Sequence, residues 1–145
     1  MLKTLHVLAA ILFVGNVIVT GVWAALAFGA RTRAADFALA ARAIVVTDVL
    51  FTSGASSLLV ATGVAQAVQR GLPLWGTPWI RDSIVLLAVS ALLWLVVLVP
   101  AQRTMRRASA DDDDVRLGAA YRRWTIVGWL AVVPLVLAVW RMVAK

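Results

Sequence analysis

Residues 78–100, PWIRDSIVLLAVSALLWLVVLVP, decide the fold class of this chain. From Ile84 to Val99, Ser90 is the only residue that is not hydrophobic. A helix needs about 20 mostly apolar residues to cross a hydrocarbon layer of about 30 Å. Thr77 stands at the expected N-cap, and Pro78 takes the first helical position, where its missing N–H costs nothing. The stretch therefore predicts a transmembrane helix.

Three further segments satisfy the same criterion, at about residues 5–28, 43–68 and 124–143. The chain is 63% hydrophobic and 14% charged, whereas a soluble domain averages about 45–50% apolar and about 25% charged residues. We therefore predict an all-α polytopic membrane protein. Its single domain, residues 1–145, holds four transmembrane helices in an up-down bundle.

The composition excludes several kinds of chemistry. There is no cysteine and only one histidine, so disulfides, thiolate sites and multi-histidine metal sites within one chain are excluded. Glutamate is absent, and four of the seven acidic residues form the run 111–114, which leaves little for paired carboxylate catalysis. We expect no catalytic residue and no metal site, and we favour a protein that is not an enzyme.

The basic residues predict the orientation of the spans. Nine arginines lie in the connections between spans 1 and 2 and between spans 3 and 4: Arg31, Arg33, Arg42, Arg103, Arg106, Arg107, Arg116, Arg122 and Arg123. The other basic residues are Lys3, Arg70, Arg81, Arg141 and Lys145. The excess places the two arginine-rich connections in the cytoplasm and both termini outside. A net charge of +7 distributed in this way fits anionic lipid head groups rather than nucleic acid.

Three local patterns refine this prediction. The alanine-rich stretch 30–43 favours a helical extension of the second span. The acidic run 111–114 lies beside arginines and is expected to be solvated, with cation binding as the alternative; it also favours the N-terminus of a short helix towards Tyr121. Pro134, inside the fourth span, predicts a kink. Trp94 and Trp129 lie deep in their spans and are expected to be packing residues.

Polar side chains at membrane depth are costly and are candidate functional groups. Asn16, Ser56, Ser57 and Ser90 fall in one layer near the midplane, close to Pro134. Hydrogen bonds between helices are one interpretation, and a midplane transport site is the other. In the second span, small and polar residues share one face that we predict to be its packing face: Asp48, Thr52, Ser56, Gly63 and Gln66.

Two ionisable residues have alternative roles. Asp48 lies about 12 Å from the midplane, at the cytoplasmic edge, where it either pairs with Arg103, Arg122 or Arg123 or relays protons. His6 lies roughly 15 Å from the midplane, at the outer boundary. It is either an interfacial histidine or a cofactor ligand, completed by Met142 or by a second protomer.

Several motifs together carry a resemblance to a known family. They are LKTLHVLAAILFVGN at the start, TDVLFT in the second span, LPLWGTPWI before the third, LLWLVVLVPAQRTMRR at its end, and the closing YRRWTIVGWLAVVPLVLAVWRMVAK. In these the chain resembles the small predicted integral membrane proteins known as domain of unknown function 2269. The resemblance implies a four-span protein of the bacterial inner membrane and brings no assigned reaction.

LKTLHVLAA is also similar to the first span of copper-resistance membrane proteins of the D type and of membrane protoporphyrinogen oxidases. In those oxidases the first-span histidine is implicated in haem binding, which points here to His6. They also carry histidines and a lysine in later spans, which this chain lacks.

Three functions follow as hypotheses. The first is a structural, accessory or interaction subunit. The second is a redox protein that binds haem b or copper through His6. The third is a small proton-coupled transporter centred on Asp48 and Asn16. The expected partners are the lipid bilayer and a second copy of the chain or a larger membrane complex.

Overall fold

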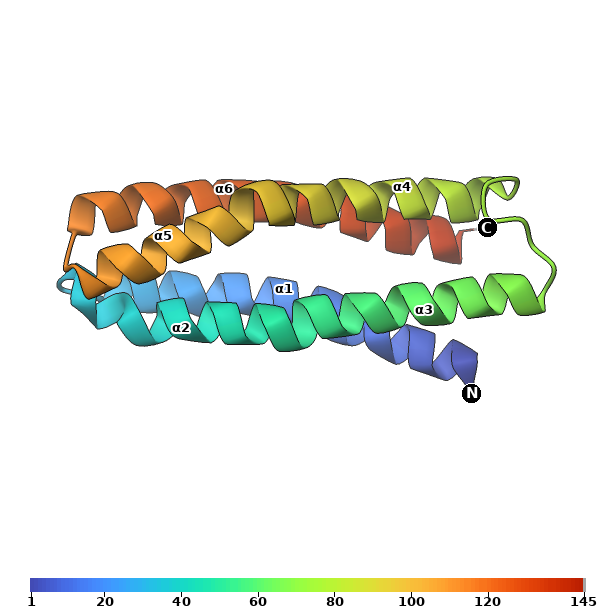
Figure 1. Cartoon of the computed structure of the whole chain (residues 1–145), viewed down its shortest axis with the longest axis horizontal. Coiled ribbons are helices and arrows are strands. Elements are labelled where there is room, and N and C mark those ends of the chain that lie inside the picture. Colours follow the sequence, from blue (N-terminus) through green and yellow to red (C-terminus); the bar gives the residue numbers. More distant parts are fainter. Residues whose placement is uncertain (145) are drawn as a thin grey trace.

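The polypeptide forms four long helical rods that run antiparallel, as the computed structural model shows for residues 1–144 (Figure 1). The first rod is α1 (Leu2–Ala30) and the fourth is α6 (Asp114–Val143). No strand occurs within these 144 residues. The all-α prediction is therefore confirmed. Lys145, which was counted among the basic residues, lies outside the described residues.

The second and third rods each join several helical segments end to end. The second consists of η1 (Ala34–Phe37), α2 (Ala38–Thr47), η2 (Asp48–Ser53) and α3 (Gly54–Gln69). The third consists of α4 (Pro78–Leu93), η3 (Trp94–Leu98) and α5 (Val99–Ala110). Both η2 and η3 are π-helical turns, in which the backbone is wound more loosely than in an α-helix.

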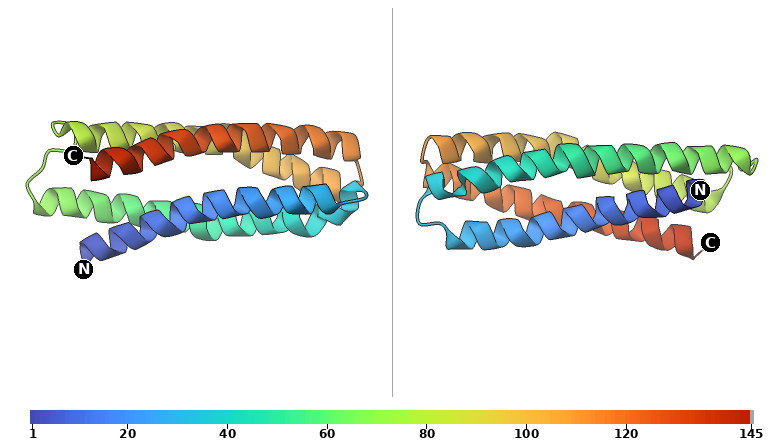
Figure 2. Two further views of the ribbon diagram at one scale, coloured as in Figure 1. Left: turned by 180° about the vertical axis from the view of Figure 1, so that it is seen from behind. Right: turned by 90° about the horizontal axis from the view of Figure 1, so that it is seen from below.

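The two ends of the bundle differ. The arginine-rich end holds the connections 31–33 and 111–113, and the terminal end holds Met1, Ala144 and the connection 70–77 (Figures 1 and 2). Along most of its length α1 packs on α3, and α4 packs on α6. At η3 the third rod changes direction, and α5 packs on α2 and η1 as well as on α6 (Figure 1). The two halves of the bundle are therefore joined mainly at the arginine-rich end.

The rods extend beyond the predicted spans at this end. The second rod begins at residue 34 rather than 43, the third ends at 110 rather than 100, and the fourth begins at 114 rather than 124. The second rod contains 36 residues, or about 54 Å at 1.5 Å per residue, which exceeds a hydrocarbon thickness of about 30 Å. Hydropathy marks only the part of a helix that lies in lipid. The helical extension at 30–43 is confirmed, whereas the short helix after the acidic run is in fact the start of α6.

Pro134 does not interrupt the fourth rod, because α6 continues from Asp114 to Val143. Next to the proline, the Ser90 hydroxyl donates a 2.9 Å hydrogen bond to the carbonyl oxygen of Ala131. A hydroxyl from a neighbouring helix thus supplies a donor to the backbone in the turn before Pro134, as transmembrane helices require around proline.

The best-packed core lies at the arginine-rich end. The side chains of Phe37, Ile44, Met105 and Leu117 are fully buried there. The ring of Tyr121 stacks on Phe28 with centroids 3.7 Å apart, and Phe37 meets both rings edge-on. Aromatic contacts of this kind contribute beyond their buried area. This end is packed like the interior of a soluble protein.

The middle of the bundle has a smaller apolar cluster. Phe13, Ala55 and Leu135 are buried together, and partly buried aliphatic side chains surround them. Outside it the rods expose large apolar residues such as Leu92 and Leu130. Exposed apolar side chains along four rods are what a lipid-facing surface requires.

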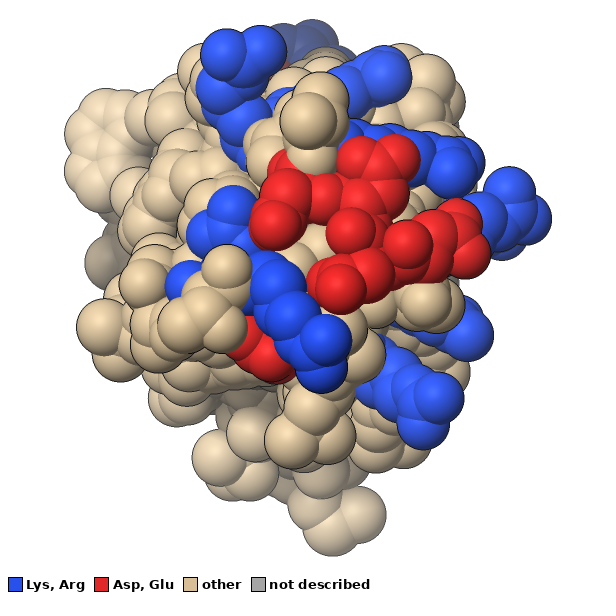
Figure 3. Space-filling model, turned by 90° about the vertical axis from the view of Figure 1, so that its left-hand side faces the viewer, with Lys and Arg blue, Asp and Glu red and all other residues tan. Residues whose placement is uncertain are grey.

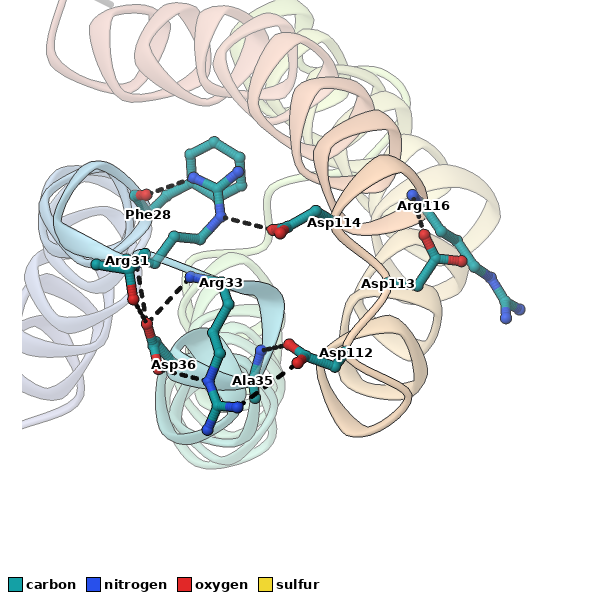
Figure 4. Close-up of polar contacts among 10 residues, drawn as sticks. Phe28, Arg31, Arg33, Ala35, Asp36, Asp112, Asp113, Asp114 and Arg116 are labelled. Atoms are coloured by element: carbon teal, nitrogen blue, oxygen red, sulfur yellow. Dashed lines mark hydrogen bonds and ion pairs between the residues drawn. The ribbon is translucent and has the colours of Figure 1, made fainter.

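The acidic run ties the two connections of the arginine-rich end together (Figure 4). Asp112 accepts a 2.8 Å hydrogen bond from the Ala35 N–H and lies 3.7 Å from an Arg33 nitrogen. Asp114 lies 3.7 Å from Nε of Arg31, and Asp113 caps α6 by accepting from the Arg116 N–H at 2.9 Å. Asp111 also lies 3.8 Å from a nitrogen of Arg116. The expectation of an exposed run beside arginines is confirmed, and all four members contact basic or backbone groups.

Viewed end-on, the acidic side chains form a central group with basic side chains around it (Figure 3). Asp36 belongs to this surface and accepts hydrogen bonds from Thr32 and from the Arg33 N–H. Within residues 1–144, no three His, Cys, Asp or Glu side chains are grouped so as to hold a metal ion. The acidic residues thus interact with basic and backbone groups of the chain itself.

Truncating the packed end should destabilise the whole bundle. Leu117→Ala removes a fully buried side chain and is expected to lower the free energy of unfolding by about 2–5 kcal/mol. Val115→Ala, two residues away and 86% exposed, is the matched control and should change it by less than about 0.5 kcal/mol. Thermal unfolding in detergent micelles measures both, and equal effects would contradict the assignment of the core to this end.

Candidate functional site

A buried carboxylate joins the second and third rods. Asp48 is only 8% exposed, and both of its oxygens accept hydrogen bonds. Oδ1 accepts from the Thr52 hydroxyl at 2.9 Å. Oδ2 accepts from Nε1 of Trp94 at 3.0 Å and from Nε2 of Gln102 at 2.5 Å. Hydrogen bonds to charged groups are the stronger ones in proteins, so this contact fixes the two rods against each other.

The two π-helical turns meet at this carboxylate. Asp48 is the first residue of η2 and Trp94 the first of η3. A π-turn inserts an additional residue into a helix and so changes the direction of the side chains around it, and such turns occur frequently at functional sites. The hydrogen bond between Asp48 and Trp94 connects the two irregular turns directly.

The polar cluster continues into the first rod. The Asn16 amide donates to Oγ1 of Thr52 at 3.2 Å, and the Thr20 hydroxyl donates to Oδ1 of Asn16 at 3.3 Å. A chain of hydrogen bonds therefore runs from Thr20 through Asn16 and Thr52 to Asp48. The predicted role of Asn16 in bonding between helices is confirmed, with Thr52 as its partner.

The expected ion pair of Asp48 is wrong. Arg103, Arg122 and Arg123 all point outward as exposed side chains. No basic nitrogen lies within 4.0 Å of the carboxylate in the part of the chain described. The neutral donors of Trp94 and Gln102 take that place, so Trp94 has a polar role besides packing.

A cavity of about 60 Å³ lies beside Asp48 and is lined by all four rods. α1 contributes Gly21, and α6 contributes Trp124, Thr125, Gly128 and Trp129. Nε1 of Trp124 and Oγ1 of Thr125 are buried, and neither has a hydrogen-bond partner among residues 1–144. Unpaired buried donors are uncommon in native proteins and call for an explanation.

Sequence reasoning missed four members of this site. Trp94 was predicted to be a packing residue and Trp124 was not singled out as a site residue, because an indole in an apolar run gives no sign of where its N–H points. Gln102 and Thr125 lie where spans 78–100 and 124–143 meet the arginine-rich connection, so their burial was not visible from hydropathy. The one available signal was Gln102, the first polar residue after an apolar run that ends at Pro100.

His6 lies against α3 of the second rod. Its Nδ1 is 3.0 Å from both the Leu59 carbonyl oxygen and Oγ1 of Thr62. Because a carbonyl oxygen only accepts, Nδ1 carries the proton and Nε2 keeps its lone pair. A Cβ atom added at Gly63 would lie 3.1 Å from Cε1 of the ring, so this glycine gives the imidazole its place.

The structure does not bring His6 and Met142 together. The hydrogen-bond contacts of His6 are with α3, and no hydrogen bond to Met142 is found within residues 1–144. The start of α1 and the end of α6 diverge at the terminal end (Figure 1). A haem group, which the similarity to the membrane oxidases implies, would have one histidine ligand per chain.

The remaining predicted polar residues bond locally or support packing. Ser90 bonds to the fourth rod, as expected for a contact between helices. Ser56 instead donates to the carbonyl oxygen of Ser53 at 3.1 Å, and Gln66 donates to that of Thr62 at 3.2 Å, both within their own helix. The predicted midplane layer is therefore wrong as a single site. Asn16 and Ser90 have different partners, and the apolar cluster of Phe13, Ala55 and Leu135 occupies the middle of the bundle.

Four helices long and apolar enough to cross a membrane define the class, a multi-pass integral membrane protein. The chain belongs to the family described as predicted integral membrane protein DUF2269, whose model matches residues 1–145. No curated protein and no solved structure matches it.

The Asp48 hydrogen bonds should contribute measurably to stability. Gln102→Leu removes a donor from a buried carboxylate and is expected to cost about 1–3 kcal/mol of unfolding free energy. Gln66→Leu is the control, because its amide bonds only to its own helix. Denaturant titration of the two variants in the same detergent measures the difference. A Gln102 variant as stable as the Gln66 variant would remove Gln102 from the network.

Proposed function

We propose that this chain is an accessory or interaction subunit of a protein complex in the bacterial inner membrane, with its arginine-rich end in the cytoplasm. The observation that carries the proposal is the packed extension of the rods at that end. From residues 100 to 110 the third rod continues about 15 Å past its predicted membrane edge, at 1.5 Å per residue. A membrane anchor alone does not need such an extension, whereas a docking surface does.

The extension presents charged groups on a rigid support. Six arginines are exposed and have no hydrogen-bond or ion-pair partner in the described chain: Arg42, Arg103, Arg106, Arg107, Arg122 and Arg123. In α5 they alternate with the buried side chains of Met105 and Ala108. Groups held in place before binding lose less conformational entropy when a partner binds. The partner that this charge favours is a protein with an acidic surface, because complementary charge steers association.

The middle of the bundle favours this role over proton-coupled transport. The Asp48 cluster includes Thr52, Asn16 and Thr20. Along the second rod, the next buried polar group after Thr52 is Thr62, ten residues or about 15 Å further on. The apolar cluster of Phe13, Ala55 and Leu135 lies in that part of the bundle. A transport pathway ordinarily needs polar groups or broken helices at the midplane.

Reversing the charge of the extension tests the proposal. In membrane patches extracted without detergent, the wild-type chain should migrate with a second polypeptide in a fixed ratio. Arg106→Glu with Arg107→Glu should reduce that association at least tenfold, whereas Arg70→Glu, at the terminal end, should preserve it. Native mass spectrometry measures the ratio. A wild-type chain that runs alone, or a complex unaffected by the double reversal, contradicts the proposal.

A redox role is the second candidate, and the orientation of His6 favours it. Ligand histidines ordinarily donate one ring N–H to a carbonyl and keep the other nitrogen for the metal, which is how His6 is held on Leu59. Since the chain has one histidine, haem or copper would need a second protomer for bis-histidine ligation. When bound, haem would supply electron transfer, and His6 would hold its iron.

The visible spectrum of the purified protein decides this second candidate. A Soret band in the wild type should disappear in His6→Ala and shift or weaken in Gly63→Ala, which displaces the ring. Gly15→Ala is the control, because a Cβ at that position meets nothing within 4 Å. A wild type without a Soret band and without copper by elemental analysis contradicts the redox role.

A further inference from the structure

The Asp48 carboxylate carries a charge that the chain does not balance. It is buried, its three donors are neutral, and none of the ion pairs within residues 1–144 includes it. Taking a carboxylate out of water is expensive, and a positive group offsets that cost only when it lies close to a carboxylate whose other lone pairs are hydrogen-bonded, as those of Asp48 are. This points to a cationic group supplied from outside the chain.

The adjoining cavity has the size and the walls for a small cation. Its volume of about 60 Å³ is enough for a few waters or for one small organic group. Three indoles line it, those of Trp94, Trp124 and Trp129, and no Lys, Arg or His does. The faces of aromatic rings attract cations, and tryptophan does so most strongly.

The same cavity also needs a hydrogen-bond acceptor. Trp124 is 8% exposed, and its Nε1–H has no acceptor in the described chain. The Thr125 hydroxyl beside it is also buried and has no hydrogen-bond partner in the described chain. Water would satisfy these donors but would leave the charge of Asp48 unbalanced. An occupant that satisfies every group carries a positive N–H at one end and an oxygen acceptor at the other.

The position of the cavity allows entry from the bilayer. It lies between α1 and α6, which run side by side at the front of the left-hand view in Figure 2. Gly21 on α1 and Gly128 on α6 line it without side chains, and Trp129 at its edge is about half exposed. Asp48 lies about 12 Å from the midplane by our estimate, close to the depth at which lipid head groups begin.

We propose that this cavity binds a protonated amino alcohol, the ethanolamine group. Its ammonium donates to the Asp48 carboxylate against the indoles, and its oxygen accepts from Trp124 Nε1 and the Thr125 hydroxyl. The group comes either from a phosphatidylethanolamine head group, which enters between α1 and α6, or from free ethanolamine. Binding is non-covalent, and the site is independent of the proposed docking surface.

Thermal unfolding in lipid nanodiscs, followed by tryptophan fluorescence, tests the proposal. In phosphatidylcholine discs, free ethanolamine should raise the Tm by several degrees in a saturable manner. Ethylene glycol lacks the ammonium and propylamine lacks the oxygen, so both should act at least tenfold more weakly. Discs that contain phosphatidylethanolamine form the second arm. A shift in that arm alone identifies the lipid as the source, and a shift in both supports the shared chemistry.

Variants locate the effect in the cavity. Asp48→Asn should abolish the shift, and Thr125→Val and Trp124→Phe should each weaken it, which keeps the test valid if the first variant does not fold. Ser83→Ala removes a buried hydroxyl at the far end of α4 and should leave the shift unchanged. The absence of a shift in both arms, an equal shift with ethylene glycol, or a shift retained in the Asp48 and Thr125 variants overturns the proposal and leaves a water-filled cavity.

Discussion

The hydrogen bonds from Trp94 and Gln102 to Asp48 are the contact on which the arrangement of this bundle depends. The chain forms two helical hairpins, and on their own each hairpin could meet the other at many angles in lipid, where apolar surfaces provide little preference. A buried carboxylate removes that freedom, because any arrangement that leaves it without donors is strongly disfavoured. The packing of α5 on α2 accompanies this contact, since Gln102 lies in α5 and Asp48 directly follows α2.

The four rods could be predicted from the sequence, because each span is predominantly apolar over about 20 residues. The helical ends beyond the membrane were visible only in part. Stretch 30–43 was expected to be helical because of its alanine content. The continuation of the third rod through 103–110 was not expected, because five polar residues in this stretch obscure its one buried face. The π-helical turns gave no signal, since neither TDVLFT nor WLVVL departs from ordinary helical composition.

The candidate site, too, could be predicted only in part from the sequence. Asn16 and Asp48 stand out in any reading, because a polar residue within an apolar run is conspicuous. Their partners could not be assigned, since the hydrogen bonds of Asp48 to Trp94 and Gln102 join residues 46 and 54 positions apart. For the same reason Arg103 and Arg122 were expected as partners: opposite charge is a sound preference, but it says nothing about which face of a helix is turned inward.

The divided packing of the bundle has a mechanical consequence. The hairpins are held together near one end, by Asp48 and the core around Phe37 and Met105, and more weakly towards the other. Asp48 lies closer to the arginine-rich end of the bundle than to the terminal end. The second rod measures about 31 Å from Asp48 to the end of α3 at 1.5 Å per residue. A rotation of roughly 5° about the carboxylate therefore displaces the terminal end by about 3 Å. A cavity occupant that caused such a rotation would therefore change the separation of the hairpins on the opposite side of the membrane.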